Sequence, residues 1–510
     1  MHKFSSASLV LALAAPLSAP SQSQAQPQSQ PPGASTPPDM ATIRQEIEAI
    51  RGAYEARLQA LEQRLKAAEL AARPATAAAG AGTAPAALAQ APAPPGAAAG
   101  TATSAPLATA LTAPVPPVAS AAAGASAFNP AMSLILSGLY GRTTQDPARY
   151  AITGFQLPKG AEAGPGTRGF SLAETELGFA ASIDPWLRGV ANIALHPDNV
   201  VSVEEAYLLT TSLGQGLQFK AGRFFSGVGY VNAQHAHTWD FVDNPLAYQA
   251  MLGTQYGDDG VQLNWLAPTD QYIELGAELG RGRSYPGGDN AQNGAGMAAL
   301  MVHTGGDIGD SQTWRAGVSL LTAKASDQSL LGLNAAGSAV TNVFSGNTRV
   351  AILDGVWKWA PGGNATRTSV KLQGEYLRST RSGNLVDDLD GSNSPGRYRA
   401  VQSGWYMQGV YQFMPRWRVG LRTERLDAGS PAFGGNTGPN AGLMAGLLAG
   451  LVTADNYRPS KNSLMLDFNP SEFSRIRLQF ARDQSRLGAT DNQVFLQYQM
   501  SLGAHGAHRY

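Results

Sequence analysis

Residues 493–510 read QVFLQYQMSLGAHGAHRY, and this stretch contains the pattern that decides the fold. From 494 to 500 every second residue is apolar or tyrosine, and the residues between them are mostly glutamine. Because successive side chains of a β-strand point to opposite faces, this period of two predicts a strand with one apolar and one mostly polar face. The last strand of a soluble sheet has the same pattern, so the rest of the chain must separate the two interpretations. The apolar positions and the terminal aromatic residue are Val494, Leu496, Tyr498, Met500 and Tyr510.

The composition favours a membrane barrel. Charged residues make up 15% of the 510 residues, which is low for a soluble protein. No apolar run of about eighteen residues follows the N-terminus, which argues against membrane helices. Alternating barrel strands give low charge without long apolar runs, because half of their residues face lipid. The zero net charge argues against nucleic acid as a partner, and the absence of cysteine excludes thiolate metal sites.

The N-terminal quarter of the sequence predicts a signal peptide for export, followed by two segments that lie outside the barrel. Residues 1–25 resemble a signal peptide, with an apolar stretch and a small-x-small cleavage site. After a disordered spacer at 26–38, residues 39–72 predict an amphipathic helix. Its exposed apolar stripe favours a self-associating coiled coil, with a trimer as the first expectation, and a solitary helix is the alternative. Residues 73–127 are rich in Ala and Pro and predict a disordered linker. The stripe consists of Ile43, Ile47, Ile50, Tyr54, Leu58, Leu61 and Leu65.

From residue 128 to 510, alternating segments of about ten residues recur between turns. About sixteen such segments can be counted, an even number as bacterial outer-membrane barrels require. We therefore expect an all-β fold, a transmembrane antiparallel β-barrel of about 16 strands. The segments begin near Met132, Ser171, Leu187, Val201, Leu217, Gly260, Tyr272, Ala299, Trp314, Val350, Ser369, Gly404, Trp417, Leu464, Ile476 and Val494.

The connections between these segments alternate strictly between short turns and mostly long polar stretches. Transmembrane barrels have this asymmetry, with short turns in the periplasm and long loops outside. The alternation predicts the bacterial outer membrane as the location and places the N-terminal extension in the periplasm. The long connections are predicted at 142–169, 226–259, 282–296, 323–348, 379–402, 427–462 and 483–492, and the short exception on that side is 196–199.

The same parity predicts a wet interior lined by charged residues, because charge facing lipid would be costly. Acidic candidates come early in the chain and basic ones late, so a field across the lumen is one interpretation and scattered charge is the other. The predicted pore-lining residues are Glu174, Glu176, Glu204, Glu274, Arg315, Lys371, Glu375, Arg418, Arg422, Glu424, Arg475 and Arg477.

The segment from 220 to 266 carries a family resemblance. Gly222-Arg223-Phe224 ends a strand, Asp240-Phe241 and Asn244-Pro245 lie in the following connection, and the next strand opens with GVQL at 260–263. This arrangement resembles the phosphate-selective porin superfamily. The resemblance implies a trimeric, sixteen-stranded channel for small solutes. The chain has no equally basic arginine and lysine ladder, so phosphate itself is doubtful as the solute.

The same connection holds His235 and His237, followed by Asp240 and Asp243. Imidazoles with carboxylates suit zinc or another borderline metal, so these four residues are a candidate metal site. With the Gly-Ala-His repeat at 503–508, the loop is also similar to plugless outer-membrane proteins of metal or siderophore uptake. In the alternative interpretation the connection folds inward and narrows the pore, and the histidines only form hydrogen bonds. No other cofactor is expected.

No enzyme signature is present, such as a Gly-x-Ser-x-Gly elbow, a phosphate-binding loop or His-Glu-x-x-His. The sequence therefore predicts a porin-like channel that passes small hydrophilic solutes by diffusion. The alternatives are a receptor for metal ions or metal-siderophore chelates, and a structural barrel that anchors the envelope. The expected partners are outer-membrane lipid, the barrel-assembly machinery, the solute, and further copies of the chain, joined through barrel and coiled coil.

Overall fold

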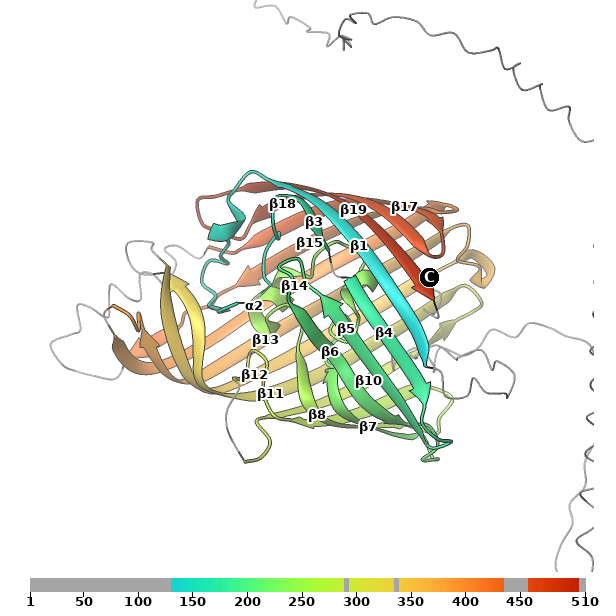
Figure 1. Cartoon of the computed structure of the whole chain (residues 1–510), viewed down its shortest axis with the longest axis horizontal. Helices are drawn as coiled ribbons and strands as arrows, with labels where there is room; N and C mark the ends of the chain where they lie inside the picture. Colours follow the sequence, from blue (N-terminus) through green and yellow to red (C-terminus); the bar gives the residue numbers. More distant parts are fainter. Residues whose placement is uncertain are drawn as a thin grey trace, which may run out of the picture. The chain divides into compact units, whose positions relative to one another are not determined.

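The computed structural model describes residues 130–160, 162–173, 175–288, 293–333, 339–391, 393–434 and 457–503. They form one closed antiparallel β-barrel with sixteen wall strands, which confirms the predicted fold class (Figure 1). The last strand pairs with the first to close the ring. The wall strands are β1 (Ala131–Thr143), β4 (Thr175–Ser182) with its extension β3 (Gly169–Leu172), β5 (Leu187–Leu195), β6 (Val201–Thr210), β7 (Leu217–Phe225), β8 (Gly257–Leu266), β9 (Tyr272–Gly280), β10 (Met297–Ile308), β11 (Gln312–Leu333), β12 (Ala339–Trp359), β13 (Ser369–Asp387), β14 (Ser394–Met414), β15 (Trp417–Asp427), β17 (Ser460–Ser471), β18 (Ser474–Gln484) and β19 (Asp491–Gly503).

Several predictions concern residues outside the described ranges and stay predictions. These are the signal peptide, the spacer, the coiled coil at 39–72, the linker that ends at 127, Glu174, and the C-terminal residues from 504 to Tyr510. Among the described residues, no helix is long and apolar enough to cross a membrane.

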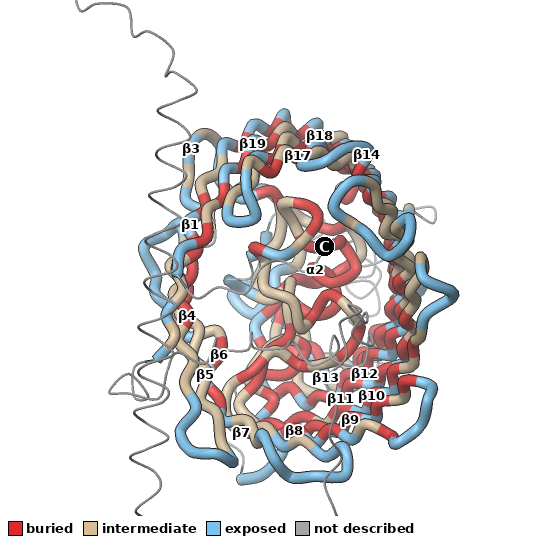
Figure 2. Tube along the Cα trace, turned by 90° about the vertical axis from the view of Figure 1, so that its right-hand side faces the viewer, coloured by how far each residue is buried: buried red, intermediate tan, exposed pale blue. Residues whose placement is uncertain are grey.

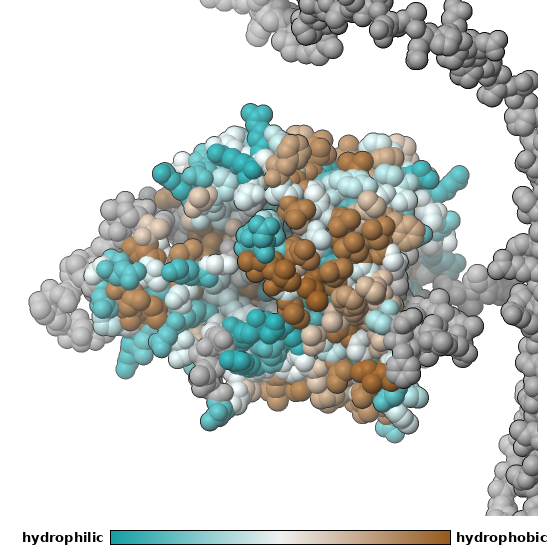
Figure 3. Space-filling view, viewed as in Figure 1, coloured by the Kyte–Doolittle hydropathy of each residue, from teal (hydrophilic) through white to brown (hydrophobic). Residues whose placement is uncertain are grey.

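Alternation along each strand sorts the side chains between the two faces of the wall. In β19, Leu496 is 47% exposed on the outer face, whereas Gln493 is 1% exposed on the inner face. Val494, Tyr498 and Met500 share the outer face with Leu496, because side chains two residues apart point the same way. Figure 3 shows apolar side chains gathered on one outer face of the barrel. The wall is therefore apolar outside and mainly polar inside.

The described residues of two predicted long connections are mostly strand instead. β11 to β14 are 19 to 22 residues long, so residues 323–333, 339–348, 379–387 and 394–402 extend the wall as two tall hairpins. The prediction of loops at 323–348 and 379–402 was wrong because the outer face loses its apolar residues there. In β13, for example, that face carries Arg378, Thr380 and Ser382, so the period-two signal disappears. The inner face of the hairpins packs around Leu330, Phe344, Leu385, Tyr398 and Phe433.

The remaining elements lie at the end of the barrel with the long connections or in the turns. β2 (Leu157–Pro158) pairs with β11 and β16 (Ala432–Gly434) pairs with β14. The short helical turns η3 (Pro147–Arg149) and η5 (Pro361–Gly363) occupy the connections after β1 and β12.

Candidate functional site

The connection between β7 and β8 turns into the barrel, as Figure 2 shows. Residues 226–256 form η4 (Ala236–Thr238) and α2 (Leu246–Leu252) between the two strands. All seven residues of α2 are buried, although the helix belongs to a connection rather than to the wall. We call residues 226–256 the inward loop. It occupies the interior of the barrel and is therefore the candidate functional site.

Apolar packing holds one side of the inward loop. Leu246 and Met251 of α2 belong to a buried cluster that includes Ile352 and Leu377 of the wall. The helix ends at Gly253, whose left-handed conformation (φ 64°) suits a C-terminal cap. The connection after β1 joins this cluster through its own apolar side chains. Ile152, Phe155 and Leu157 of that connection thus pack with the inward loop in one buried cluster.

Wall carboxylates bind backbone amides of the inward loop. Glu375 on β13 accepts hydrogen bonds from the N–H groups of Tyr230 and Val231, both at 3.1 Å. Its oxygens also accept from the hydroxyl of Tyr248 at 2.7 Å. A buried carboxylate with several donors fixes the loop backbone at one point. The other amide–carboxylate bonds join Gly227 to Glu278 (2.8 Å) and Leu246 to Glu424 (2.5 Å).

Asp240 of the inward loop pairs with basic residues of the wall. Its carboxylate lies 2.9 Å from Lys371 Nζ on β13 and 3.6 Å from Arg418 Nη1 on β15. Burial by itself would raise the pKa of Asp240, but the charges of Lys371 and Arg418 outweigh it and hold the pKa well below its usual range. The aspartate is therefore charged at neutral pH and attached to the wall.

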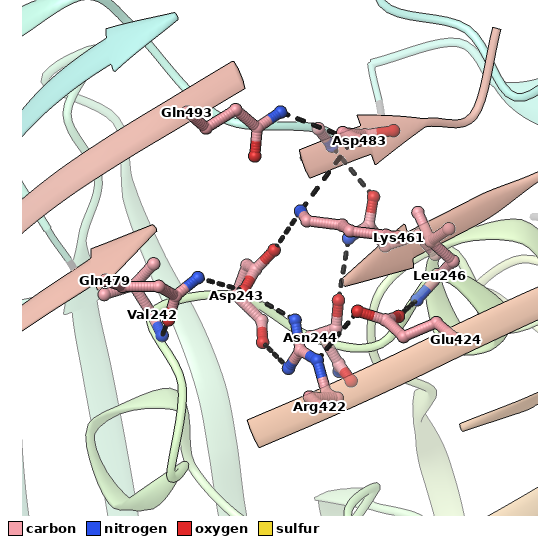
Figure 4. Close-up of polar contacts among 12 residues, drawn as sticks. Val242, Asp243, Asn244, Leu246, Arg422, Glu424, Lys461, Gln479, Asp483 and Gln493 are labelled. Atoms are coloured by element: carbon pink, nitrogen blue, oxygen red, sulfur yellow. Dashed lines mark hydrogen bonds and ion pairs between the residues drawn. The ribbon is translucent and has the colours of Figure 1, made fainter. Parts of the chain in front are cut away.

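Asp243 forms a second ionic attachment, drawn in Figure 4. Its carboxylate accepts from Arg422 Nη2 at 2.7 Å and from Gln479 Nε2 at 3.0 Å, and it also pairs with Lys461 on β17. Burial opposes ionisation of Asp243, yet the charges of Arg422 and Lys461 prevail and lower its pKa. Asp240 and Asp243 together thus join the loop to β13, β15 and β17. We call these two aspartates the anchoring aspartates.

The structure separates the four predicted metal ligands into two groups. His235 and His237 lie side by side, with ring centroids 5.6 Å apart. Asp240 and Asp243 turn away from them toward the basic wall residues. The neighbours of the imidazoles are instead carboxylates of β4 and β6. Metal binding by the histidines stays a prediction, now with a different set of carboxylates.

A β-bulge supplies two of those carboxylates. The register between β5 and β6 shifts at Asn192/Ile193, which leaves Glu204 as the extra residue before Glu205. Two adjacent side chains therefore face the interior, where regular alternation would turn one outward. Glu204 lies 3.3 Å from His235 Nδ1, and Glu205 lies 2.9 Å from His235 Nε2. Burial would lower the pKa of His235, but the negative charge of Glu176 and the carboxylates of Glu204 and Glu205 beside the ring raise it well above its ordinary value.

The other predicted pore-lining residues that the structure describes also face the interior, and each has a protein partner. That any of them lines a path for solutes stays a prediction. The contacts are Arg475 to the His237 carbonyl (2.7 Å), Arg477 to Asp467 (2.7 Å), Arg422 to Glu424 (2.7 Å), Arg315 to Asp354 (3.0 Å) and Glu274 to His303 (3.3 Å).

Several residues that hold the loop were missed by the sequence analysis. Lys461, which pairs with Asp243, occupies an inward position of β17, so parity could have found it. Glu205 could not be found this way, because the bulge breaks the alternation. Tyr248 lies within the connection, and nothing local to the sequence indicates that it reaches Glu375.

The fold and the site together define a class: a closed sixteen-stranded antiparallel barrel whose interior holds one of its own connections. No protein-family model matches the chain. A protein of Aquifex aeolicus (strain VF5), described as an uncharacterized protein, is 30% identical to it over 412 residues, which cover 75% of this chain and 80% of that protein. The chain belongs to the family of this Aquifex protein.

Among solved structures, a loop-deletion mutant of the outer-membrane protein OmpT of Vibrio cholerae is 10% identical, with a TM-score of 0.44. The alignment covers 73% of this chain and 98% of that one. The outer-membrane channel DcaP of Acinetobacter baumannii is 12% identical, with a TM-score of 0.41 and coverage of 73% and 96%. OprB of Pseudomonas putida is 14% identical, with a TM-score of 0.41 and coverage of 73% and 94%.

Proposed function

We propose that the protein is a channel of the bacterial outer membrane that passes small hydrophilic solutes by diffusion through a barrel narrowed by the inward loop. The observation that carries this proposal is the reversed polarity of the wall. Leu300, Val318, Leu353 and Leu421 are between 53% and 64% exposed on the outer face of β10, β11, β12 and β15. Charged side chains such as Arg315, Asp354 and Arg422 occupy inward positions of β11, β12 and β15. This is the arrangement that a barrel needs in lipid.

The two ends of the barrel support an orientation. Short turns join the strands at one end, and Trp186, Trp265 and Trp417 lie close to them. Tryptophan is favoured at membrane–water interfaces, and short turns are typical of the periplasmic side. The chain enters β1 at this same end. The predicted N-terminal extension would then lie in the periplasm.

The inward loop argues for size selection and against phosphate selectivity. It crosses the interior from Glu176 and Glu205 on one side to Arg422 and Lys461 on the other, so it narrows any path through the barrel. Arg422 and Lys461 already pair with Asp243, and Lys371 already pairs with Asp240. Cations neutralised in this way offer little attraction to a free anion.

Liposome swelling tests the proposal directly. Purified full-length protein in liposomes should admit small neutral sugars and amino acids, with rates that fall steeply as the solute grows. Replacing both anchoring aspartates by asparagine should admit larger solutes. Asp259→Asn is the matched control, because Asp259 pairs with Arg223 at a partly exposed site outside the loop. Liposomes that stay impermeable to every solute with both proteins would refute the channel.

A further inference from the structure

Four side chains of two kinds converge between the inward loop and the wall. Glu176 comes from β4 and Glu204 from the bulge in β6, while His235 directly precedes η4 and His237 lies within it. Glu176 Oε2 lies 3.2 Å from His235 Nδ1 and 3.1 Å from His237 Nδ1. Glu204 Oε2 lies 3.3 Å from the same nitrogen of His235. The donor atoms of Glu176, His235 and His237 all lie within 4.8 Å of one another.

These separations match the edges of a coordination polyhedron. Zinc binds imidazole nitrogen and carboxylate oxygen at about 2.0–2.2 Å, so neighbouring ligands of a tetrahedral ion lie roughly 3.3–3.5 Å apart. The three measured nitrogen–oxygen distances, from 3.1 to 3.3 Å, are close to this range. An ion between Glu176, His235 and His237 would require only small side-chain movements, whereas Glu204, which touches only His235 among these three, would have to move toward the other two.

The atoms that face each other are not satisfied by hydrogen bonds. Among the described residues, Glu176 Oε2, Glu204 Oε2 and His235 Nδ1 are buried and form none, because the directions of their contacts are unsuitable. Glu176 as a whole is 5% exposed. Buried polar atoms without hydrogen bonds are costly, so a group that binds them together is expected.

The second ring nitrogen of His235, Nε2, contacts a carboxylate, as in many metal sites. Its Nε2 lies 2.9 Å from Glu205 Oε2, so this nitrogen donates its hydrogen to the carboxylate. When the ring loses its second proton to a bound cation, the lone pair is left on Nδ1, which faces Glu176 and Glu204. A carboxylate on the second imidazole nitrogen is what fixes the tautomer of metal-binding histidines. On the other histidine, Arg475 holds the backbone carbonyl of His237 at 2.7 Å.

We propose that Glu176, Glu204, His235 and His237 bind one borderline divalent cation of the zinc type, and that this ion attaches the inward loop to β4 and β6. A mixed nitrogen and oxygen set suits such ions, whereas calcium and magnesium prefer oxygen ligands alone. The anchoring aspartates hold the loop to β13, β15 and β17. The ion supplies the attachment to the remaining side. The site depends on the inward position of the loop and not on any passage of solutes.

Metal binding to the purified full-length protein in detergent tests this site. The background variant is His505→Ala/His508→Ala, because those imidazoles are metal donors by their chemistry alone. Calorimetry with ZnCl2 should give one equivalent per chain, and CoCl2 should give the intense visible absorption of a tetrahedral cobalt ion. On that background, His235→Ala/His237→Ala should weaken zinc binding at least about 100-fold, and Glu205→Gln about 10- to 100-fold.

His196→Ala is the matched control. His196 also pairs with a carboxylate, Glu162, at 2.8 Å, but it lies outside the convergent group. Zinc binding should be unchanged in this variant. Full zinc affinity in His235→Ala/His237→Ala would overturn the site, as would the absence of any bound zinc in the background protein. If that double variant does not fold, the cobalt spectrum of the background protein decides, and a weak octahedral spectrum contradicts the proposal.

Discussion

Gly229 occupies a position in the inward loop that admits no side chain. Its φ is 70°, and a Cβ atom there would lie 2.5 Å from both Glu375 Oε2 and Tyr248 Oη. These are the two groups that fix the backbone of the loop at Tyr230. A side chain at residue 229 must therefore displace that hydrogen-bonded group or the loop itself.

We expect Gly229→Ala to release this part of the loop. The free energy of unfolding should fall by about 1–3 kcal/mol from backbone strain, with a further loss from the clash. Chymotrypsin should then cleave between 230 and 248, where the loop is rich in aromatic residues. The control is Gly214→Ala, at φ 74° with no atom within 4 Å of the added Cβ. Equal protease resistance of the two variants would contradict the role given to Gly229.

The anchoring aspartates make the attachment of the loop sensitive to acid. The pKa values of Asp240 and Asp243 are lowered in the folded protein, so the stabilisation is complete above the unfolded pKa of about 4 and is lost as the pH falls through the folded values. The contribution of the two aspartates is the difference in melting temperature between the unaltered protein and the double asparagine variant. This difference should be constant between pH 5 and 7 and should decrease below about pH 4. A difference that stays the same from pH 7 down to pH 2 would contradict the ionic attachment.

The position of a single residue can be predicted from the sequence when it depends on the strand that contains the residue, and not when it depends on contacts with distant segments. Glu176 and Arg422 were assigned to the interior from strand parity, and their side chains face it. Parity missed Glu205 because the bulge at Glu204 changes the alternation. The grouping of His235 with Asp240 was unpredictable for another reason. Spacing along a loop says nothing about which wall strand each side chain meets.

At the scale of elements, the alternation that predicted the strands has a physical limit. The period-two pattern can be recognised in the sequence only where the outer face of a strand is apolar. The tall hairpins of β11–β14 extend beyond the apolar part of the wall, and their strands remain paired although their outer face is polar. Their stability comes from the inner face, where Phe344 is completely buried and lies near Tyr398 and Arg381.

We expect Phe344→Ala to loosen these hairpins without opening the barrel. Truncation of a buried phenylalanine costs about 3–5 kcal/mol, but this cluster is separate from the one around α2. Trypsin should cut faster near Arg397 and Arg399, while the remaining wall stays resistant. Phe473→Ala, at an exposed turn residue, is the control. Cleavage throughout the barrel would mean that the hairpins support the whole fold.

At the scale of the whole molecule, the N-terminal extension predicts the oligomeric state. The apolar stripe at 39–72 predicts self-association, and a trimer, which would place three barrels side by side, is the first expectation by analogy with porins. Deleting residues 39–72 should lower the mass measured by light scattering in detergent or weaken the oligomer on dilution. If the oligomer is unchanged and equally stable after the deletion, contacts of the barrel alone hold it together. A monomer before the deletion would refute the predicted trimer.

The most direct test of the central claim is the single-channel conductance of the purified protein in planar bilayers. The account predicts stable ohmic steps of small size, because the inward loop narrows an otherwise wide barrel. Asp240→Asn/Asp243→Asn should give larger or noisier steps, and Asp259→Asn should behave like the unaltered protein. Bilayers that stay silent with the unaltered protein and with the double variant would contradict a diffusion channel narrowed by its own loop.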